Sequence, residues 1–170
     1  NIMIKKKKDI INSLATHKND VGSTEIQIGL LTEKIIKLSK TMSIIDDSYN
    51  ANYESMIAAI NYLNTFENYK IIVFGEIGEL GKFSKQIHLK IAKYLHKNFT
   101  GIVIGFGLDT QVFEMLLKDN FFYTQNHDQI LEILHSITRK KSCTLLFKGS
   151  RLNKLDFVIK KLVHHYKEKI

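Results

Sequence analysis

From residue 42 onward, short runs rich in β-branched and aromatic residues alternate with longer segments in which apolar residues recur every three or four positions. The short runs predict strands and the longer segments predict amphipathic helices. Strands that alternate with helices of this length are joined by βαβ crossovers, so the pattern predicts an α/β fold with a mainly parallel sheet and helices on both faces. The predicted strands are 43–45, 70–74, 101–105, 121–123 and 143–147, and the predicted helices are 54–66, 84–96, 110–118, 129–138 and 152–166.

The first forty residues follow a different pattern. Residues 4–40 predict a short α-helical hairpin, with a turn at 20–23 and a capping box from Thr24 and Gln27. A hairpin of this size buries little apolar surface by itself. We therefore divide the chain into a helical hairpin, 1–40, and an α/β domain, 41–170. The second helix is predicted from one apolar stripe formed by Ile28, Leu31, Ile35 and Leu38.

The charge of the chain is concentrated near its start. The formal net charge is +8, and residues 1–40 contain eight lysines against four acids, so they carry half of the excess. A basic excess permits contact with nucleic acid or other anions, although a run such as 5–8 is more often a solvated end. No apolar stretch approaches the ~20 residues of a membrane span. We expect no membrane span and a cytoplasmic location.

Two polar segments follow predicted strands, where parallel sheets bind their ligands. Residues 46–52 contain two carboxylates, a hydroxyl and two amides, which suit either a ribose or metal-water site or the cap of the helix that follows. Residues 148–151 contain a glycine and two cations at the start of the last helix. They suit a phosphate or carboxylate, and the alternative is a tight turn with exposed basic residues.

Other candidate chemistry is weak. The segment 75–82 lacks the spacing of a phosphate-binding P-loop, and Phe83 stands where such a loop has Ser or Thr. The histidines form no metal-ligand pattern, and we interpret His88 as a hydrogen-bonded structural residue. Cys143 is the one cysteine and lies in an apolar run, which predicts a buried thiol.

Several of these motifs resemble one family. Residues 44–52, which read Ile-Ile-Asp-Asp-Ser-Tyr-Asn-Ala-Asn, are similar to the signature that opens the C-terminal domain of MurF cell-wall ligases. Residues 73–81 and 148–151 resemble the family's second and last signatures, and His88 matches a histidine of the next helix. The family usually has proline at Tyr53 and Gly-Asp-Met at 75–77. The resemblance covers the chain from about residue 42 and implies a Rossmann-like fold.

The resemblance also implies a function. These ligases have an N-terminal domain for the UDP-sugar, a central P-loop ATPase domain, and a C-terminal domain of the present kind. With ATP and Mg²⁺ they add D-alanyl-D-alanine to UDP-MurNAc-tripeptide. The missing N-terminal and central domains would be partners of this chain, which we expect to be incomplete and to bind no cofactor alone. By analogy Asp47, Tyr49, Asn50 and Asn52 face the nucleotide side of the cleft, and Lys148, Gly149, Ser150 and Arg151 line the side for the dipeptide.

The N-terminal segment is similar to a second family. Residues 9–11, 15–17, 20–28 and 30–35 resemble the start of small-subunit ribosomal protein fifteen, and the resemblance ends near Ser39. It implies possible RNA contacts at Gly22, Ser23 and Gln27. We expect weak, salt-sensitive RNA binding, because the later helices of that family are missing. The alternatives to a ligase domain are thus an rRNA-binding protein with a ligase-derived tail, or a small nucleotide-binding module.

Overall fold

A single six-stranded sheet forms the centre of the computed structural model, which describes residues 35–139 and 141–168. The strands lie in the order β1-β2-β6-β3-β4-β5, with β1 antiparallel to β2 and every other neighbouring pair parallel. This confirms the predicted mainly parallel sheet. The strands are β1 (Ile35–Lys37), β2 (Met42–Asp47), β3 (Tyr69–Gly75), β4 (Ile102–Phe106), β5 (Phe121–Thr124) and β6 (Cys143–Lys148).

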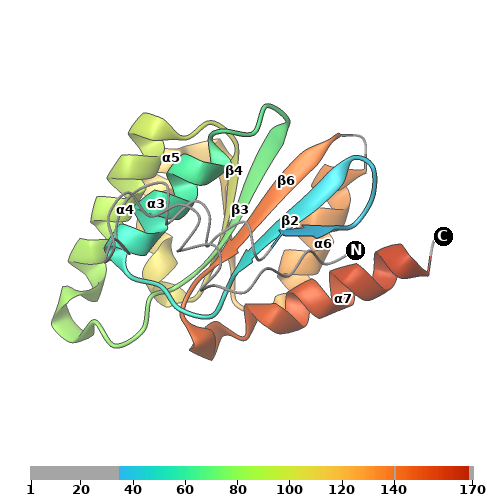
Figure 1. The fold of residues 1–170 in the computed structure, drawn as a ribbon. Helices are drawn as coiled ribbons and strands as arrows, with labels where there is room; N and C mark the ends of the chain where they lie inside the picture. The colour runs from blue at the N-terminus through green and yellow to red at the C-terminus, as the bar shows by residue number, and fades with distance from the viewer. Residues whose placement is uncertain (1–34, 140, 169–170) are drawn as a thin grey trace, which may run out of the picture.

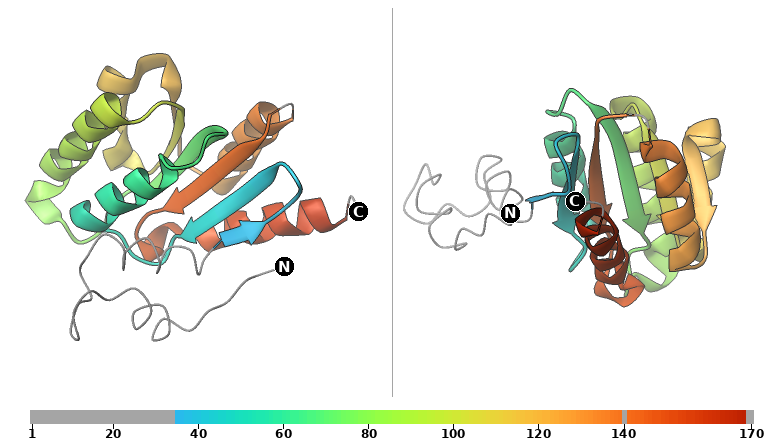
Figure 2. Two further views of the ribbon diagram at one scale, coloured as in Figure 1. Left: turned by 45° about the horizontal axis from the view of Figure 1, so that its top comes forward. Right: turned by 90° about the vertical axis from the view of Figure 1, so that its right-hand side faces the viewer.

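Helices cover both faces of this sheet. In Figures 1 and 2, α3, α4 and α5 lie on one face, whereas α6 and α7 lie on the other. The region predicted as one helix over 110–118 is instead a 3-10 helix followed by a single turn of α-helix. The helices are α3 (Tyr53–Leu63), α4 (Ser84–Asn98), α5 (Glu114–Leu117), α6 (His127–Thr138) and α7 (Leu155–Lys167), with 3-10 helices η1 (Gly81–Phe83), η2 (Leu108–Phe113), η3 (Lys118–Asn120) and η4 (Arg151–Asn153).

The alternation of side chains along the strands produces two hydrophobic cores. On β3, Ile71 and Val73 pack with the residues of α6 and α7, whereas Ile72 and Phe74 pack with those of α3 and α4. Successive strand residues point to opposite faces, so a strand covered on both sides is apolar throughout. This explains why the central strands appear in the sequence as continuous apolar runs rather than as alternating ones. The thiol of Cys143 is buried in the α6–α7 core, as predicted.

The end of the predicted second helix is a strand, so this part of the helical hairpin prediction is wrong. Ile35 pairs with Ile45 and Lys37 with Ser43 in the antiparallel β1–β2 ladder, and Leu38 is buried. An unpaired edge of β2 would leave backbone groups without partners, and two adjacent β-branched isoleucines suit a strand. The helical spacing of Ile35 and Leu38 therefore arises by coincidence. Ile28 and Leu31 lie outside the described residues.

The sheet thus begins before the predicted division at residues 40 and 41. The chain turns at Ser39–Thr41, where the backbone N–H of Leu38 donates to the carbonyl oxygen of Met42. Residues 35–40 consequently belong to the α/β unit, and the division of the remaining N-terminal residues into a separate unit stays a prediction. None of the helices in the described part of the chain is long and apolar enough to cross a membrane.

Candidate functional site

The two predicted polar segments meet at the carboxyl edge of the sheet. Strand β6 lies between β2 and β3, and the register places Lys148 beside both Asp47 and Phe74. The loops that follow these three strands therefore begin at the same level. Sequence separation gives no sign of this proximity, because β6 enters the sheet between two strands that precede it in the chain.

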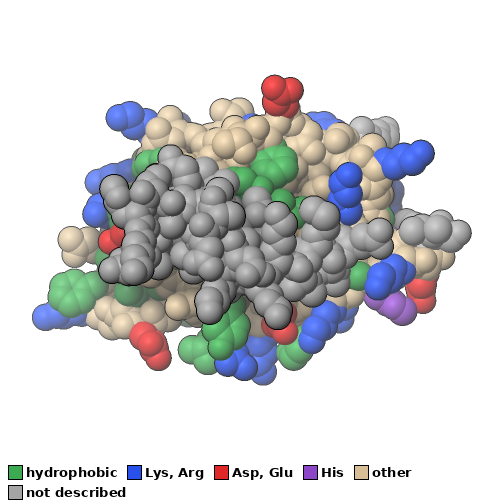
Figure 3. All heavy atoms as spheres, in the orientation of Figure 1, with side chains coloured by type: hydrophobic (Ala, Val, Ile, Leu, Met, Phe, Trp, Pro, Cys, Tyr) green, Lys and Arg blue, Asp and Glu red, His purple; other side chains and the backbone are tan. Residues whose placement is uncertain are grey.

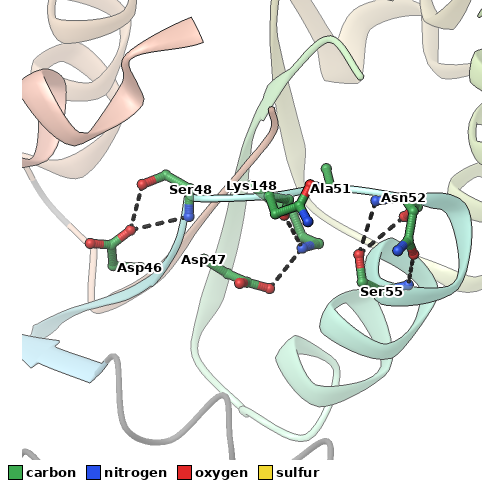
Figure 4. A network of polar contacts seen from close by, with 8 residues as sticks. Asp46, Asp47, Ser48, Ala51, Asn52, Ser55 and Lys148 are labelled. Carbon is green, nitrogen blue, oxygen red and sulfur yellow. Dashed lines mark hydrogen bonds and ion pairs between the residues drawn. The ribbon is translucent and has the colours of Figure 1, made fainter. Parts of the chain in front are cut away.

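A buried ion pair joins the two segments. Lys148 is only 1% exposed, and its Nζ lies 2.8 Å from Oδ2 of Asp47. The same ammonium donates a hydrogen bond of 2.9 Å to the carbonyl oxygen of Asn50 (Figure 4). A buried charge is costly unless it is paired and hydrogen-bonded, and here both conditions are met. Lys148 therefore ties the β2 loop to β6, and its charge is directed into the protein.

The polar groups of the β2 loop also serve local structure. Asn52 accepts a hydrogen bond of 2.8 Å from the N–H of Ser55, whose hydroxyl oxygen accepts one from the N–H of Asn52. This capping box starts α3, so the helix-cap interpretation holds for Asn52. Oδ1 of Asp46 accepts from both the N–H and the hydroxyl of Ser48 (Figure 4). The loop is thus cross-linked by hydrogen bonds between its own residues.

The outer part of the same edge faces solvent. Tyr49 is 65% exposed, and the guanidinium carbon of Arg151 lies 5.1 Å from the centre of its ring. Arg151 also donates a hydrogen bond of 3.3 Å to the Tyr49 hydroxyl. Asn50 is exposed and Ser150 half-buried. The structure therefore brings residues of both predicted sides together, with Arg151 supplying the cation that faces solvent.

Gly149 allows the end of β6 to approach the end of β3. A Cβ at this position would lie 2.7 Å from the Cα of Gly75 and 2.8 Å from its carbonyl oxygen, so any side chain forces the backbone to move. The lack of a side chain at Gly149 thus serves the contact between two neighbouring strand ends. Asn153 fixes this junction, because its amide donates to the carbonyl oxygens of Glu76 at 2.8 Å and Ser150 at 3.0 Å.

A second network holds the loops after β3 and β4. Glu76 Oε2 accepts from the N–H of Asp109 at 3.0 Å, and the Ser84 hydroxyl donates to Asp109 Oδ2 at 2.5 Å. His88 is fully buried, with Nε2 accepting from the N–H of Ile77 at 3.0 Å and Nδ1 lying 2.8 Å from the Ser84 carbonyl oxygen. A neutral imidazole protonated on Nδ1 satisfies both contacts. The structural interpretation of His88 is confirmed.

Sequence reasoning missed Asn153, Ser84 and the contacts of Asp109. Their signal is weak, because each is a single polar residue near the start of a helix, where such residues are common. As for metal binding, no group of three or more His, Cys, Asp or Glu side chains within residues 35–139 and 141–168 could hold an ion. The carboxylates of Asp46 and Asp47 are instead engaged by Ser48 and Lys148.

Comparison with known proteins identifies the family. The family model described as Mur ligase, glutamate ligase domain, matches residues 33–151. This range includes every strand from β1 to β6 and both loops of the candidate site. The chain therefore belongs to the Mur ligase family, and the fold that its sequence resemblance implied is confirmed.

Individual relatives indicate one branch of that family. The chain is 36% identical over 148 residues to the UDP-N-acetylmuramoyl-tripeptide–D-alanyl-D-alanine ligase of Buchnera aphidicola subsp. Baizongia pistaciae, covering 86% of this chain and 32% of that ligase. A crystal structure of MurF from Acinetobacter baumannii matches with a TM-score of 0.71 and 27% identity, over 82% of this chain and 33% of that one. MurF from Thermotoga maritima in complex with ADP matches with a TM-score of 0.67 and 24% identity, over 80% and 31%. The chain thus spans about a third of the length of these relatives.

A shorter similarity concerns ribosomal proteins. Small ribosomal subunit protein uS15 of Caldanaerobacter subterraneus subsp. tengcongensis is 46% identical over 39 residues, which cover 23% of this chain and 44% of that protein. The possible RNA contacts Gly22, Ser23 and Gln27 lie outside the described residues.

Proposed function

We propose that this chain acts as the C-terminal domain of an ATP-dependent cell-wall ligase that adds D-alanyl-D-alanine to UDP-MurNAc-tripeptide. The observation that carries the proposal is the convergence of residues 47–52 and 148–151 at the carboxyl edge of a Mur ligase sheet. Ligands of such sheets bind at this edge. The ADP complex of the Thermotoga maritima relative supports a nucleotide as one ligand of the complete enzyme.

The proposal gives the candidate residues different tasks. Tyr49, Asn50 and Arg151 form the exposed rim, where an aromatic ring, an amide and a guanidinium meet solvent. A guanidinium suits a phosphate or a carboxylate, which are the charged groups of the nucleotide and the dipeptide. Lys148 and Asp47 hold this rim in place from beneath. ATP supplies the phosphoryl group in the proposed reaction, and the N-terminal and central domains are the proposed partners.

A domain exchange tests the proposal. Residues 35–170 replace the C-terminal domain of the Acinetobacter baumannii enzyme, and phosphate release that depends on D-alanyl-D-alanine is measured. We expect activity from the chimera, loss of most of it with Arg151→Ala, and none from the ligase truncated before the exchanged domain. The isolated chain is expected to hydrolyse no ATP. A chimera that unfolds cooperatively but releases no more phosphate than the truncated enzyme would contradict the proposal.

The ribosomal similarity supports a second candidate, an rRNA-binding protein with a ligase-derived tail. The test compares affinity for the ribosomal three-way junction with affinity for a scrambled RNA at two salt concentrations. Backbone contacts alone weaken steeply with salt and do not distinguish the two RNAs. Strong preference for the junction at the higher salt would favour the ribosomal function, whereas equal binding would exclude specific rRNA recognition.

A further inference from the structure

Helix α4 has an unusual charge distribution. Its sequence contains Lys85, Lys90, Lys93 and Lys97 and no acidic residue, and η1 adds Lys82 just before it. The buried residues of α4 are His88, Ile91, Ala92 and Leu95. At 100° per residue, Lys90, Lys93 and Lys97 lie on the side opposite these four and form one outward stripe. The helix is about 22 Å long, so the three lysines form a line along its outward-facing side.

The cations of this stripe differ from those of α7 in their ion pairs with described carboxylates. Neither Lys93 nor Lys97 forms an ion pair in the part of the chain that the structure describes. On α7, by contrast, Lys160 lies 3.8 Å from Asp156 and Lys161 lies 3.7 Å from Asp128. Like charges three and four residues apart on a helix repel one another. A polyanion lying along α4 would relieve this repulsion, and α7 offers no comparable gain.

Aromatic rings accompany the cations. The Nζ of Lys90 lies 4.1 Å from the centre of the Tyr53 ring, and that of Lys82 lies 5.3 Å from the centre of the Phe83 ring. Phe83 is 55% exposed, although it is large and apolar. The exposed ring of Phe83 beside Lys82 offers a stacking surface for an unpaired base. Figure 3 shows Lys and Arg side chains along the left margin of the molecule, on the side where Figure 1 places α4.

We propose that Lys82, Phe83 and the α4 stripe bind the backbone of single-stranded nucleic acid. The outward stripe of Lys90, Lys93 and Lys97 consists of cations, whereas Ile91, Ala92 and Leu95 of the same helix are buried in the core, so the stripe itself offers charge and no apolar side chain to a lipid surface. The lysines succeed one another along a line instead of converging on one point, which suits a chain of phosphates better than a single small anion. Contacts of this kind depend on phosphate charge and base stacking, so we expect no preference for a particular base sequence.

The test uses the full chain and a fluorescein-labelled oligouridine of about 20 nucleotides, longer than the site of a single binding module. Anisotropy titrations over a range of salt concentrations give the slope of log K against log salt. Each phosphate contact to a single strand contributes about 0.7 to this slope. The triple variant Lys90→Gln, Lys93→Gln, Lys97→Gln is therefore expected to lower the slope by about 2. Gln and Lys have similar helix propensities, so folding is expected to persist and is checked by thermal unfolding.

The matched control removes the same charge from α7, with Lys160→Gln, Lys161→Gln and Lys167→Gln. We expect its slope to change by less than about 1, since these lysines would contact no phosphate. Phe83→Ala is expected to weaken binding without changing the slope. Equal losses in the two triple variants would show that net charge alone matters and would overturn the proposal, as would a slope that the α4 variant leaves unchanged.

Two further arms separate the possible sources of the polyanion. Oligothymidine DNA of the same length is expected to bind within a few-fold of the RNA, because the phosphate contacts ignore the sugar. A tenfold or greater preference for either would overturn backbone recognition. Sedimentation with anionic phosphatidylserine vesicles is expected to show little binding through α4. Vesicle binding that the α4 variant abolishes would assign the stripe to membranes instead.

Discussion

The inner and outer parts of the carboxyl edge contrast sharply, although they are built from the same two segments. Lys148 and Arg151 stand three positions apart, yet Lys148 is 1% exposed and paired with Asp47, whereas Arg151 is exposed beside Tyr49. A charge enclosed by protein has contacts that folding itself must provide. A charge on the rim keeps its hydration and its freedom to meet a ligand. In one short motif, therefore, Lys148 stabilises the loops of the site, whereas Arg151 is placed to contact a ligand.

The largest expected effect comes from Lys148→Met. The variant keeps an apolar stem but removes the buried ammonium that pairs with the Asp47 carboxylate, and breaking such a pair costs about 3 kcal/mol. Unfolding in urea measures the loss. The double variant Asp47→Leu, Lys148→Met is expected to recover part of it, because both charges of the pair are then replaced by apolar groups. If Lys148→Met alone unfolds with the same free energy as the wild type, Lys148 does not support the fold and does not differ from Arg151 in this respect.

Asn153→Ala is expected to cost about 2 kcal/mol. The change removes two hydrogen bonds from the Asn153 amide, to the carbonyl oxygens of Glu76 and Ser150, and each such bond contributes about 1 kcal/mol. The free energy of unfolding gives the value, with Lys154→Gln as a neighbouring exposed control. A change below about 0.5 kcal/mol, the range of surface substitutions, would show that Asn153 contributes no more to stability than the exposed residues of the rim.

Arg151→Ala and Tyr49→Ala probe the rim. Each is expected to cost no more than about 1 kcal/mol, since both residues are exposed and lose mainly their contact with each other. A double-mutant cycle isolates their cation–π contact, which at an exposed site contributes about 0.5–1 kcal/mol. A coupling well above 1 kcal/mol would show that the pair is structural. The domain-exchange enzyme should nevertheless lose activity with Arg151→Ala.

Cys143 extends the comparison to the opposite end of β6. Burial raises the pKa of its thiol above the ordinary value, with a smaller lowering effect from Lys141. The unfolded thiol ionises near pH 8.5, so the unfolded state gains stability first and the fold loses stability as the pH rises above that value. The effect is measured as the difference between the wild type and Cys143→Ala across pH 7–10. Identical pH profiles would indicate an accessible thiol.

Much of the fold was readable from local pattern. Apolar runs predicted the five parallel strands, because a strand buried on both faces needs apolar residues at every position. The recurrence of apolar residues over 84–96 predicted α4, and a helix cap, one of the two interpretations of residues 46–52, is formed by Asn52 and Ser55. The edge strand β1 was missed. Ile35 and Leu38 fit a helix equally well, and only the unpaired edge of β2 favours a strand there.

The candidate site shows the same division between sequence and tertiary structure. The sequence determined which residue types stand at strand ends, and it indicated their family through residues 44–52 and 148–151. The fold decided which of those groups face a ligand. Inserting β6 between β2 and β3 encloses Lys148 against Asp47 and leaves Arg151 on the rim. Burial depends on neighbours far apart along the chain, so a basic residue read from its local sequence alone reveals its charge but not its environment.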